Sequence, residues 1–355
     1  MNDDPENAPA EDQIAQAPRG DKDWHIYLGT GTPHDGIRRL RPPPPWRAFG
    51  GLPLIKPQFP ESAGDEAAGR RLGAPQRAMV YRADSEVVDM VNAALLLRRP
   101  LLVTGKPGTG KSTLAYSIAY ELKLGPVLHW AITSRSTLAE GLYQYDALAR
   151  LQEASLRQTV GGTGSAQPPD IGRFIRLGPL GTALLPQERP RVLLIDELDK
   201  SDIDLPNDLL HVFEEGHFTI SELARLPGDQ PAAEVFTADG DHPVPVQRGQ
   251  VTCHAFPVVV ITSNGEREFP PAFHRRCMRL DIKPPDATKL AAIVTAQLGE
   301  DAVSRAEPIL ERFLQNRERG NIATDQLLNA IYFATAGAPS TEWDAIERML
   351  LTPID

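Results

Sequence analysis

Eight residues of this chain carry the pattern of a phosphate-binding loop. Gly105, Lys106, Pro107, Gly108, Thr109, Gly110, Lys111 and Ser112 match the sequence G-x-x-x-x-G-K-[ST]. An apolar run at 101–104 predicts a buried strand before the loop, and apolar residues at helical spacing from Leu114 to Leu122 predict a helix after it. In such loops backbone N–H groups wrap a phosphate chain, and glycines adopt conformations that side chains would block. The sequence therefore predicts a nucleotide site here rather than a glycine-rich connecting turn.

Two side chains at the end of this loop could act on a bound nucleotide. Lys111 would reach the β- and γ-phosphates, and the hydroxyl of Ser112 would hold Mg²⁺. The helix that follows adds partial positive charge at its N-terminus, where a phosphate would sit. We therefore predict that Gly105–Ser112 and Thr113 contact a nucleotide, with ATP and Mg²⁺ as the cofactors.

Polar residues also end two later apolar runs. The run Val192–Ile195 ends in Asp196 and Glu197, and the run Val258–Ser263 ends in Asn264. Ligands of α/β proteins sit at the carboxyl ends of parallel strands. We predict that Asp196 binds Mg²⁺, that Glu197 polarises the water attacking the γ-phosphate, and that Asn264 positions this water. The alternative for Asn264 is a cap at the end of its strand.

Arg275 and Arg276 follow shortly after, at the end of a short helix predicted over 269–276. From the edge of the domain they could face the nucleotide of a neighbouring subunit. An arginine presented to a transferring phosphoryl group accelerates the reaction by roughly 10³–10⁵. The alternative is a pair of arginines that is solvated or paired with acids.

The composition limits the classes of protein to which this chain can belong. Of its 355 residues, 41% are hydrophobic and 24% are charged, as in globular domains. A formal net charge of −10 disfavours non-specific binding to nucleic acid. The presence of only 2 cysteines excludes a disulfide framework and fits a reducing compartment. Because no apolar run is long enough for a transmembrane helix or a signal peptide, we expect a cytoplasmic protein.

The chain divides into three regions. Residues 1–78 comprise an acidic tail, expected to be disordered over 1–23, and an arm with the polyproline segment Pro42–Pro45. Residues 79–285 alternate strands with helices, which predicts an α/β domain whose parallel sheet is covered on both faces. Residues 286–355 predict a small helical domain, with helices at 286–298, 301–318, 324–336 and 341–351.

Other features of these regions give more local expectations. Residues 138–185 predict a hairpin or loop inserted into a helix, with a flexible tip at 161–165. Residues 216–256 predict short strands with turns at 227–229 and 239–241. The first helix is predicted at 79–99, and His129 is predicted to be a packed strand residue rather than a ligand. The aromatic residues of the arm either dock on the core, on a neighbour or on a partner, or belong to a plain linker; they are Trp24, Tyr27, Trp46 and Phe49.

Together, these motifs resemble an AAA+ ATPase of the MoxR-like group over about residues 79–355. The segments that carry the resemblance are Gly105–Ser112, Val192–Glu197, Val258–Asn264 and Pro271–Arg276. The resemblance implies a P-loop core with a five-stranded parallel sheet of order 5-1-4-3-2, a helical lid domain, and a homo-oligomeric ring, a hexamer, that remodels a protein partner. It implies that 138–185 is the helix-2 insert and 216–256 the pre-sensor-1 hairpin of that clade. It also implies that Asn264 is the sensor-1 residue and that Arg276, or alternatively Arg275, is the finger acting in trans.

Two further segments bear on this resemblance. The lid segment Ile322–Gln326 has no arginine where many relatives carry a sensor-2 arginine. The arm at 24–49 is similar to N-terminal segments of MoxR-like ATPases encoded beside von Willebrand A-type proteins, which implies such a protein as a partner.

Two other classes of function compete with a ring ATPase that acts on a protein. One is a nucleic-acid motor of the restriction or helicase type on the same core, and the other is a scaffold that binds ATP without turnover. A hairpin that faces nucleic acid should be basic. The predicted hairpin instead carries Glu222, Asp229, Glu234, Asp239 and Asp241 against Arg225 and Arg248. This balance favours the protein partner, and the presence of Asp196, Glu197 and Arg276 disfavours the scaffold.

Overall fold

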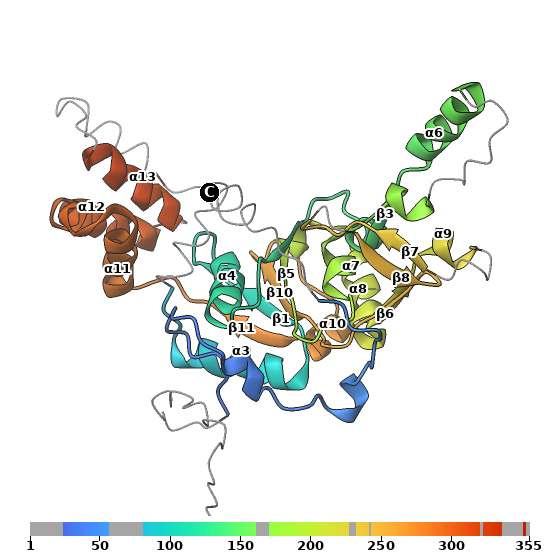
Figure 1. Ribbon diagram of the computed structural model, residues 1–355. Helices are drawn as coiled ribbons and strands as arrows, with labels where there is room; N and C mark the ends of the chain where they lie inside the picture. The colour runs from blue at the N-terminus through green and yellow to red at the C-terminus, as the bar shows by residue number, and fades with distance from the viewer. Residues whose placement is uncertain are drawn as a thin grey trace, which may run out of the picture.

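The computed structural model describes residues 24–56, 81–160, 170–226, 232–240, 243–319, 322–335 and 351–352. These residues form an α/β body, a separate group of three helices, and a helix that extends away from the body (Figure 1). In the described part of the chain, no helix is both long and apolar enough to cross a membrane.

A five-stranded parallel sheet lies at the centre of the α/β body. Its strands run β11-β1-β10-β5-β2 across the sheet. They span Leu101–Thr104 (β1), Leu128–Ala131 (β2), Val192–Asp196 (β5), Val258–Ser263 (β10) and Met278–Asp281 (β11). Numbered among themselves in chain order, these five strands have the order 5-1-4-3-2. The predicted fold class, an α/β P-loop core with this strand order and a C-terminal helical region, is confirmed.

Alternating side chains of these strands enter two cores on opposite faces of the sheet. Leu101 and Val103 pack with helices α3 and α4, whereas Leu102 packs with α7 and α8. The helices span Ser85–Leu97 (α3), Lys111–Glu121 (α4), Pro179–Ala183 (α7), Leu205–Glu215 (α8) and Pro271–Arg276 (α10). The first helix therefore begins later than predicted, because Asp84 is in an extended conformation (ψ 161°) and the chain from 81 to 84 is irregular.

Two insertions add further strands and helices to the α/β body. The first contains an antiparallel pair of strands and a projecting helix: α5 (Leu138–Leu142), β3 (Tyr143–Tyr145), α6 (Ala147–Val160), η3 (Ile171–Phe174) and β4 (Ile175–Leu177). The second is a sheet of order β6-β9-β8-β7 with a short helix: β6 (His217–Thr219), α9 (Ser221–Ala224), β7 (Ala232–Val235), β8 (Val244–Gln247) and β9 (Gln250–Thr252). The predicted tip at 161–165 and the predicted turn at 227–229 lie outside the described residues, as does part of the turn at 239–241.

Three helices after the sheet share a core of their own. They are α11 (Ala287–Leu298), α12 (Glu300–Arg319) and α13 (Thr324–Thr335), close to the predicted ranges. Leu290, Phe313 and Leu327 are buried in this core. The fourth predicted helix lies outside the described residues except for Leu351, which is buried in the same core.

The described part of the N-terminal arm, residues 24–56, packs on the α/β body, so the alternative of a plain linker is wrong for this part of the arm. Tyr27 is fully buried, and its hydroxyl shares a 2.9 Å hydrogen bond with Ser117 of α4. Asn92 of α3 accepts hydrogen bonds from the backbone of Ile26 and Tyr27. Trp46 differs from the other aromatic residues of the arm because it is exposed and does not dock on the chain.

A buried carboxylate fixes the arm to the helix that follows the phosphate loop. Glu121, at the end of α4, accepts hydrogen bonds from the backbone N–H groups of Leu28, Gly29 and Gly31 at 2.5–3.1 Å. Burial alone would raise the pKa of Glu121, but hydrogen bonds from His34, Leu28 and Gly31 outweigh burial and hold the pKa below its ordinary value. This carboxylate therefore contributes stability above its ordinary pKa, and the contribution is lost as the pH falls through the lowered value.

The variant Glu121→Gln tests this anchor. We expect its free energy of unfolding at pH 7 to fall by about 1–3 kcal/mol, because a neutral amide satisfies the buried backbone donors poorly. Urea titration would measure the loss, and the difference between parent and variant should shrink as the pH drops below about 4. Glu86→Gln, on the exposed start of α3, is the matched control, with an expected change within about 0.5 kcal/mol. Equal losses for both variants would contradict the anchor.

Candidate functional site

The loop Gly105–Ser112 connects the carboxyl end of β1 to the first turn of α4. Gly108 and Gly110 have φ angles of +74° and +88°, a region in which other residues are strained. Gly110 stands at the N-cap position, so α4 begins at Lys111 with its first N–H groups directed at the loop. Thr109 closes the loop by donating its hydroxyl proton to the carbonyl of Lys106 at 2.9 Å. The loop therefore has the local geometry to surround a phosphate.

The ammonium group of Lys111 curls back into this loop. Its Nζ donates to the carbonyl oxygens of Gly105 and Lys106 at 2.8 and 2.9 Å. Lys111 is only 7% exposed, and its burial lowers its pKa even though Asp199, Asp196 and Glu197 stabilise its charge. A buried cation thus lies where the loop would receive the charge of a phosphate chain.

Several polar side chains contact the carboxylate of Asp196. Its Oδ1 accepts hydrogen bonds from Ser112 Oγ at 2.7 Å and from Thr262 Oγ1 at 2.6 Å. His129 Nε2 lies 3.3 Å from its other oxygen. Burial alone would raise the pKa of Asp196, but hydrogen bonds from His129, Thr262 and Ser112 outweigh it and keep this pKa below its ordinary value. An adjacent hydroxyl and carboxylate are oxygen ligands of the kind Mg²⁺ takes, so this pair fits the predicted metal.

The contact with His129 corrects the prediction that this residue is packed inside the sheet. Strand β2 lies at the edge of the sheet, and its residues alternate between buried and exposed. Leu128 and Trp130 enter the core, whereas His129 faces outward beside Asp196. A half-buried edge strand therefore presents a polar side chain where the sequence suggested a fully buried strand.

Glu197 directly follows Asp196 and has an unusual backbone conformation. Its φ of 61° is left-handed, and its N–H donates to Thr262 Oγ1 at 2.8 Å. Asn264 Nδ2 lies 3.4 Å from Glu197 Oε1, so the structure brings these two predicted site residues together. Lys200, in η4 (Leu198–Lys200), forms a 2.7 Å ion pair with the other carboxylate oxygen. Left-handed conformations at such positions aim a side chain at the cost of strain.

Asp199, Thr262 and Lys200 support this site and were not predicted from the sequence. Asp199 is buried, and its Oδ2 accepts from the backbone N–H of Asn264 at 2.9 Å, so it fixes the segment that carries the predicted sensor. Its Oδ1 is buried and has no hydrogen-bond partner among the described residues. The acidic and hydroxyl residues near the ends of β5 and β10 were the signal in the sequence that could have identified these supporting residues. Which of them contact one another depends on how the two strands align.

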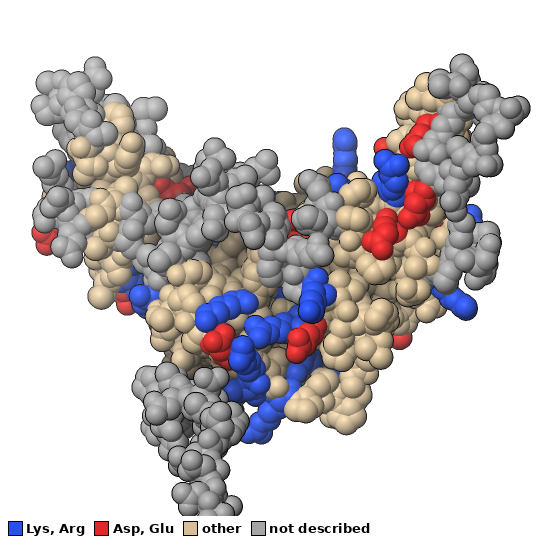
Figure 2. Space-filling model, viewed as in Figure 1, with Lys and Arg blue, Asp and Glu red and all other residues tan. Residues whose placement is uncertain are grey.

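Arg275 and Arg276 lie apart from these residues. They end α10, which leads into the start of β11, whereas the other candidate residues follow the carboxyl ends of β1, β5 and β10. Arg276 forms an ion pair with Glu214, and Arg275 is exposed. Lysine and arginine side chains gather on this part of the surface, over α3, β11 and α10 (Figure 2). Within one chain, the two arginines and the phosphate loop are not brought together.

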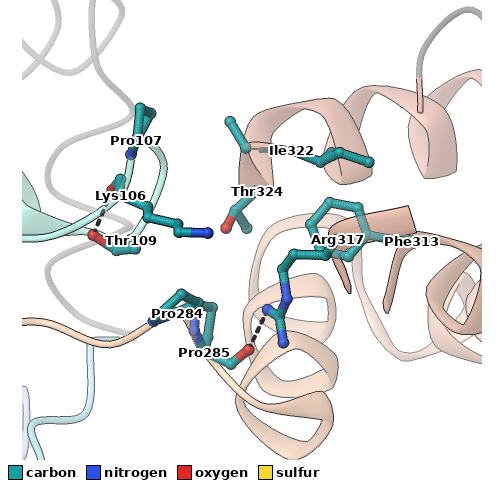
Figure 3. Close-up of a pocket in the computed structure, with 10 residues that line it drawn as sticks. Lys106, Pro107, Thr109, Pro284, Pro285, Phe313, Arg317, Ile322 and Thr324 are labelled. Atoms are coloured by element: carbon teal, nitrogen blue, oxygen red, sulfur yellow. Dashed lines mark hydrogen bonds between the residues drawn. The ribbon is translucent and has the colours of Figure 1, made fainter. Parts of the chain in front are cut away.

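A cavity of about 150 Å³ is lined by the loop and by the C-terminal helices (Figure 3). Its lining comes from the loop, from the segment after β11 and from α12 and α13: Lys106, Pro107, Thr109, Pro284, Pro285, Phe313, Arg317, Ile322, Ala323 and Thr324. A Cβ on Gly108 would lie 2.6 Å from the backbone nitrogen of Thr324, so the loop and the start of α13 are in close contact.

The start of α13 has no arginine, but Arg317 of α12 brings a guanidinium to the same cavity. This group donates a hydrogen bond to the carbonyl of Pro285 at 2.6 Å. It lies 5.9 Å from the centroid of the Phe313 ring. The sequence did not identify Arg317 as a residue of this cavity, because Arg317 precedes Ile322–Gln326, the segment in which many relatives carry an arginine.

Comparison with known families agrees with this geometry. The family model for the AAA domain (dynein-related subfamily) matches residues 100–277, from the start of β1 to the end of α10. No curated protein matches the chain. The matched segment is half of the 355-residue chain and contains the loop, the acidic strand end, Asn264 and both arginines. The chain therefore belongs to the dynein-related subfamily of AAA domains and is an ATPase of the AAA+ class.

Proposed function

We propose that this protein binds Mg²⁺–ATP at Gly105–Thr113 and hydrolyses it with Asp196, Glu197 and Asn264. The observation that carries this proposal is the convergence of Ser112 on Asp196, at 2.7 Å, beside the Glu197–Asn264 pair. These groups come from three separate parts of the chain and meet at the carboxyl ends of adjacent strands. That edge of a parallel sheet is where α/β proteins bind nucleotides.

Each side chain has a distinct task in this proposal. Lys111 and the backbone N–H groups of the loop bind the phosphates and neutralise their charge. Ser112 and Asp196 would hold Mg²⁺, which supplies further positive charge to the β- and γ-phosphates. Glu197 polarises the attacking water, and Asn264 orients it toward the γ-phosphate. Because Glu197 is paired with Lys200, it must exchange this partner for water before it can act.

The proposed output is the remodelling or switching of a protein partner by a MoxR-like ring, a hexamer, with Arg276 or alternatively Arg275 completing the site of the neighbouring subunit. A von Willebrand A-type protein is the proposed partner, on the resemblance of the arm. The described part of the hairpin carries Glu222, Glu234 and Asp239 against Arg225 and Arg248, and this slight excess of acidic residues supports a protein substrate. A separation of the arginines from the phosphate loop in one chain is what a finger acting in trans requires.

The variant Lys111→Ala tests nucleotide binding. We expect its Kd for Mg²⁺–ATP, measured by calorimetry, to rise by at least about tenfold, because a hydrogen bond to a charged group contributes about 1.5–3 kcal/mol. Lys123→Ala is the matched control, since Lys123 lies just beyond the other end of α4 and pairs with Asp35. An unchanged affinity in Lys111→Ala would refute the assignment of the phosphate loop.

A further inference from the structure

Two exposed apolar side chains lie on surfaces of opposite charge. Trp46 is 76% exposed and lies in η2 (Pro45–Arg47) of the arm. Ile203 is 62% exposed and lies between η4 and α8. Large exposed apolar groups are common at sites where another molecule binds, and tryptophan is enriched among the residues that dominate such contacts.

The chain on both sides of Trp46 is held in place. The neighbouring Arg47 is buried and donates to the carbonyl of Phe213, at the end of α8, at 2.5 Å. Its guanidinium lies 5.7 Å from the centroid of the Phe256 ring. On the other side Pro42–Pro45 stiffens the backbone. A residue whose backbone is fixed on both sides loses little backbone entropy when it is bound.

Other arginines lie near Arg47, the residue next to Trp46, because the charges of Arg99 and Arg276 act on its guanidinium. Arg99 donates to the carbonyl of Arg275 at 3.3 Å, and Arg276 pairs with Glu214 at the end of α8. Burial and the nearby charge of Arg99 lower the pKa of Arg47, as expected in a cluster with an excess of positive charge. We call Trp46, Arg47, Arg99, Arg275 and Arg276 the basic face.

Carboxylates outnumber cations in the exposed segments that include Ile203. The residues concerned follow β5 and β10, and we call them the acidic face: Asp202, Ile203, Asp204, Asp208, Glu266 and Glu268, all exposed. Two exposed cations, Lys200 and Arg267, lie in the same segments, and Arg267 donates to the carbonyl of Ser201 at 2.6 Å, so five carboxylates face two cations here. Asp199 joins the two segments, because its Oδ2 accepts from the backbone N–H groups of Asn264 and Glu266 at 2.9 and 3.1 Å. The acidic face therefore adjoins the Glu197–Asn264 pair.

The two faces lie at opposite ends of the strands of the central sheet, the basic face at their amino ends and the acidic face at their carboxyl ends. The arginines Arg99, Arg275 and Arg276 precede β1 and β11, whereas the acidic face follows the ends of β5 and β10. Because all five strands are parallel, their amino ends lie on one side of the sheet and their carboxyl ends on the opposite side. Helix α8 begins at the acidic face and ends at the basic face, and its 11 residues separate its ends by about 16 Å. One chain therefore cannot bring its own two faces together.

We propose that the basic face of one copy packs against the acidic face of a second copy, with Trp46 against Ile203. The proposal rests on the proposed ring, and it adds a specific contact supplied by the arm. Two different faces in contact make a head-to-tail interface, which closes into a ring when the rotation between copies allows it. Opposite charges then steer the two faces together, while the apolar pair at the centre supplies buried area. The contact would also place Arg275 and Arg276 beside the neighbour's Glu197–Asn264 pair.

Charge substitutions at the apolar pair test this contact. The experiment measures the concentration at which half of the chains are assembled, by analytical ultracentrifugation with Mg²⁺–ATP, in the Glu197→Gln background that keeps ATP bound. We expect Trp46→Glu and Ile203→Lys each to raise this concentration at least tenfold. The double variant should recover most of the loss, because its new charges are opposite and in contact. Leu148→Glu, on exposed α6, is the matched control and should assemble like the parent.

The outcomes separate this inference from the proposed function. ATP affinity measured on each variant checks that it is folded and keeps its nucleotide site. Assembly of both single variants at the parent's concentration would overturn the Trp46–Ile203 contact but leave the ring intact. A parent that binds ATP and stays monomeric would overturn both the ring and this contact. If Trp46→Glu assembles normally but loses salt-dependent binding to single-stranded DNA, the basic face is a nucleic-acid surface and the inference is wrong.

Discussion

Glutamine in place of Glu197 should stop ATP turnover while leaving ATP binding intact. The amide retains the size of the side chain and can still contact Asn264, but it cannot take up a proton from water. We expect kcat to fall by about 10²–10⁴ with little change in the Kd for Mg²⁺–ATP. Phosphate release and calorimetry on the same preparation would measure the two quantities.

A matched substitution separates this effect from a general loss of charge. Glu86→Gln removes a carboxylate from the exposed start of α3, which contains none of the site residues, and should hydrolyse ATP at the parent rate. Hydrolysis by Glu197→Gln at the parent rate would show that another group activates the water. Loss of ATP binding together with turnover would instead show that Glu197 has a structural role, through its contacts with Lys200 and Thr262.

The second large effect is expected at Arg276, if this residue acts on the nucleotide of a neighbouring subunit. Arg276→Ala should cut turnover by roughly 10³–10⁵ with nearly unchanged ATP binding, because an arginine finger stabilises charge in the transition state. Its partner Glu214 lies at the end of α8, so the finger must exchange this ion pair for the neighbour's nucleotide. The rate per chain of the parent should rise with protein concentration over the range in which it assembles.

Mixing two inactive variants distinguishes action in trans from action within one chain. Lys111→Ala lacks a working nucleotide site but retains its arginines, and Arg276→Ala has the reverse defect. A mixed ring contains interfaces that combine one intact site with one intact finger, so activity should reappear on mixing. Co-assembly of the two variants must be verified in the same samples. No recovery in confirmed mixed rings would move the assignment to Arg275 or to a mechanism without a ring.

The parts of the fold and site that the sequence predicted depend on local patterns. The loop at Gly105–Ser112 lies between a short strand and a helix, and each of these three elements carries its own signal. Asp196 and Asn264 were both predicted to act on the nucleotide because each follows or ends a predicted parallel strand, and ligands bind at the carboxyl ends of such strands. Helical spacing likewise predicted α11, α12 and α13, since each buries one face in a shared core.

The parts that the sequence missed depend on contacts between distant segments. His129 was expected to be buried, but only the position of β2 at the sheet edge decides which way it faces. Asp199 acquires its role from the alignment of β5 with β10, which places it under the backbone of Asn264. Tyr27 and Trp46 belong to the same aromatic arm, yet one is buried against α4 and the other is exposed. No local pattern distinguishes those two outcomes.

The central claim is that this chain hydrolyses ATP at the site formed by Gly105–Ser112, Asp196 and Glu197. Steady-state phosphate release from Mg²⁺–ATP, measured for the parent and Lys111→Ala across a range of protein concentrations, tests it most directly. We predict turnover by the parent that requires Mg²⁺ and is lost in Lys111→Ala. Equal rates for the two proteins, or no release by the parent at any concentration, would contradict the account.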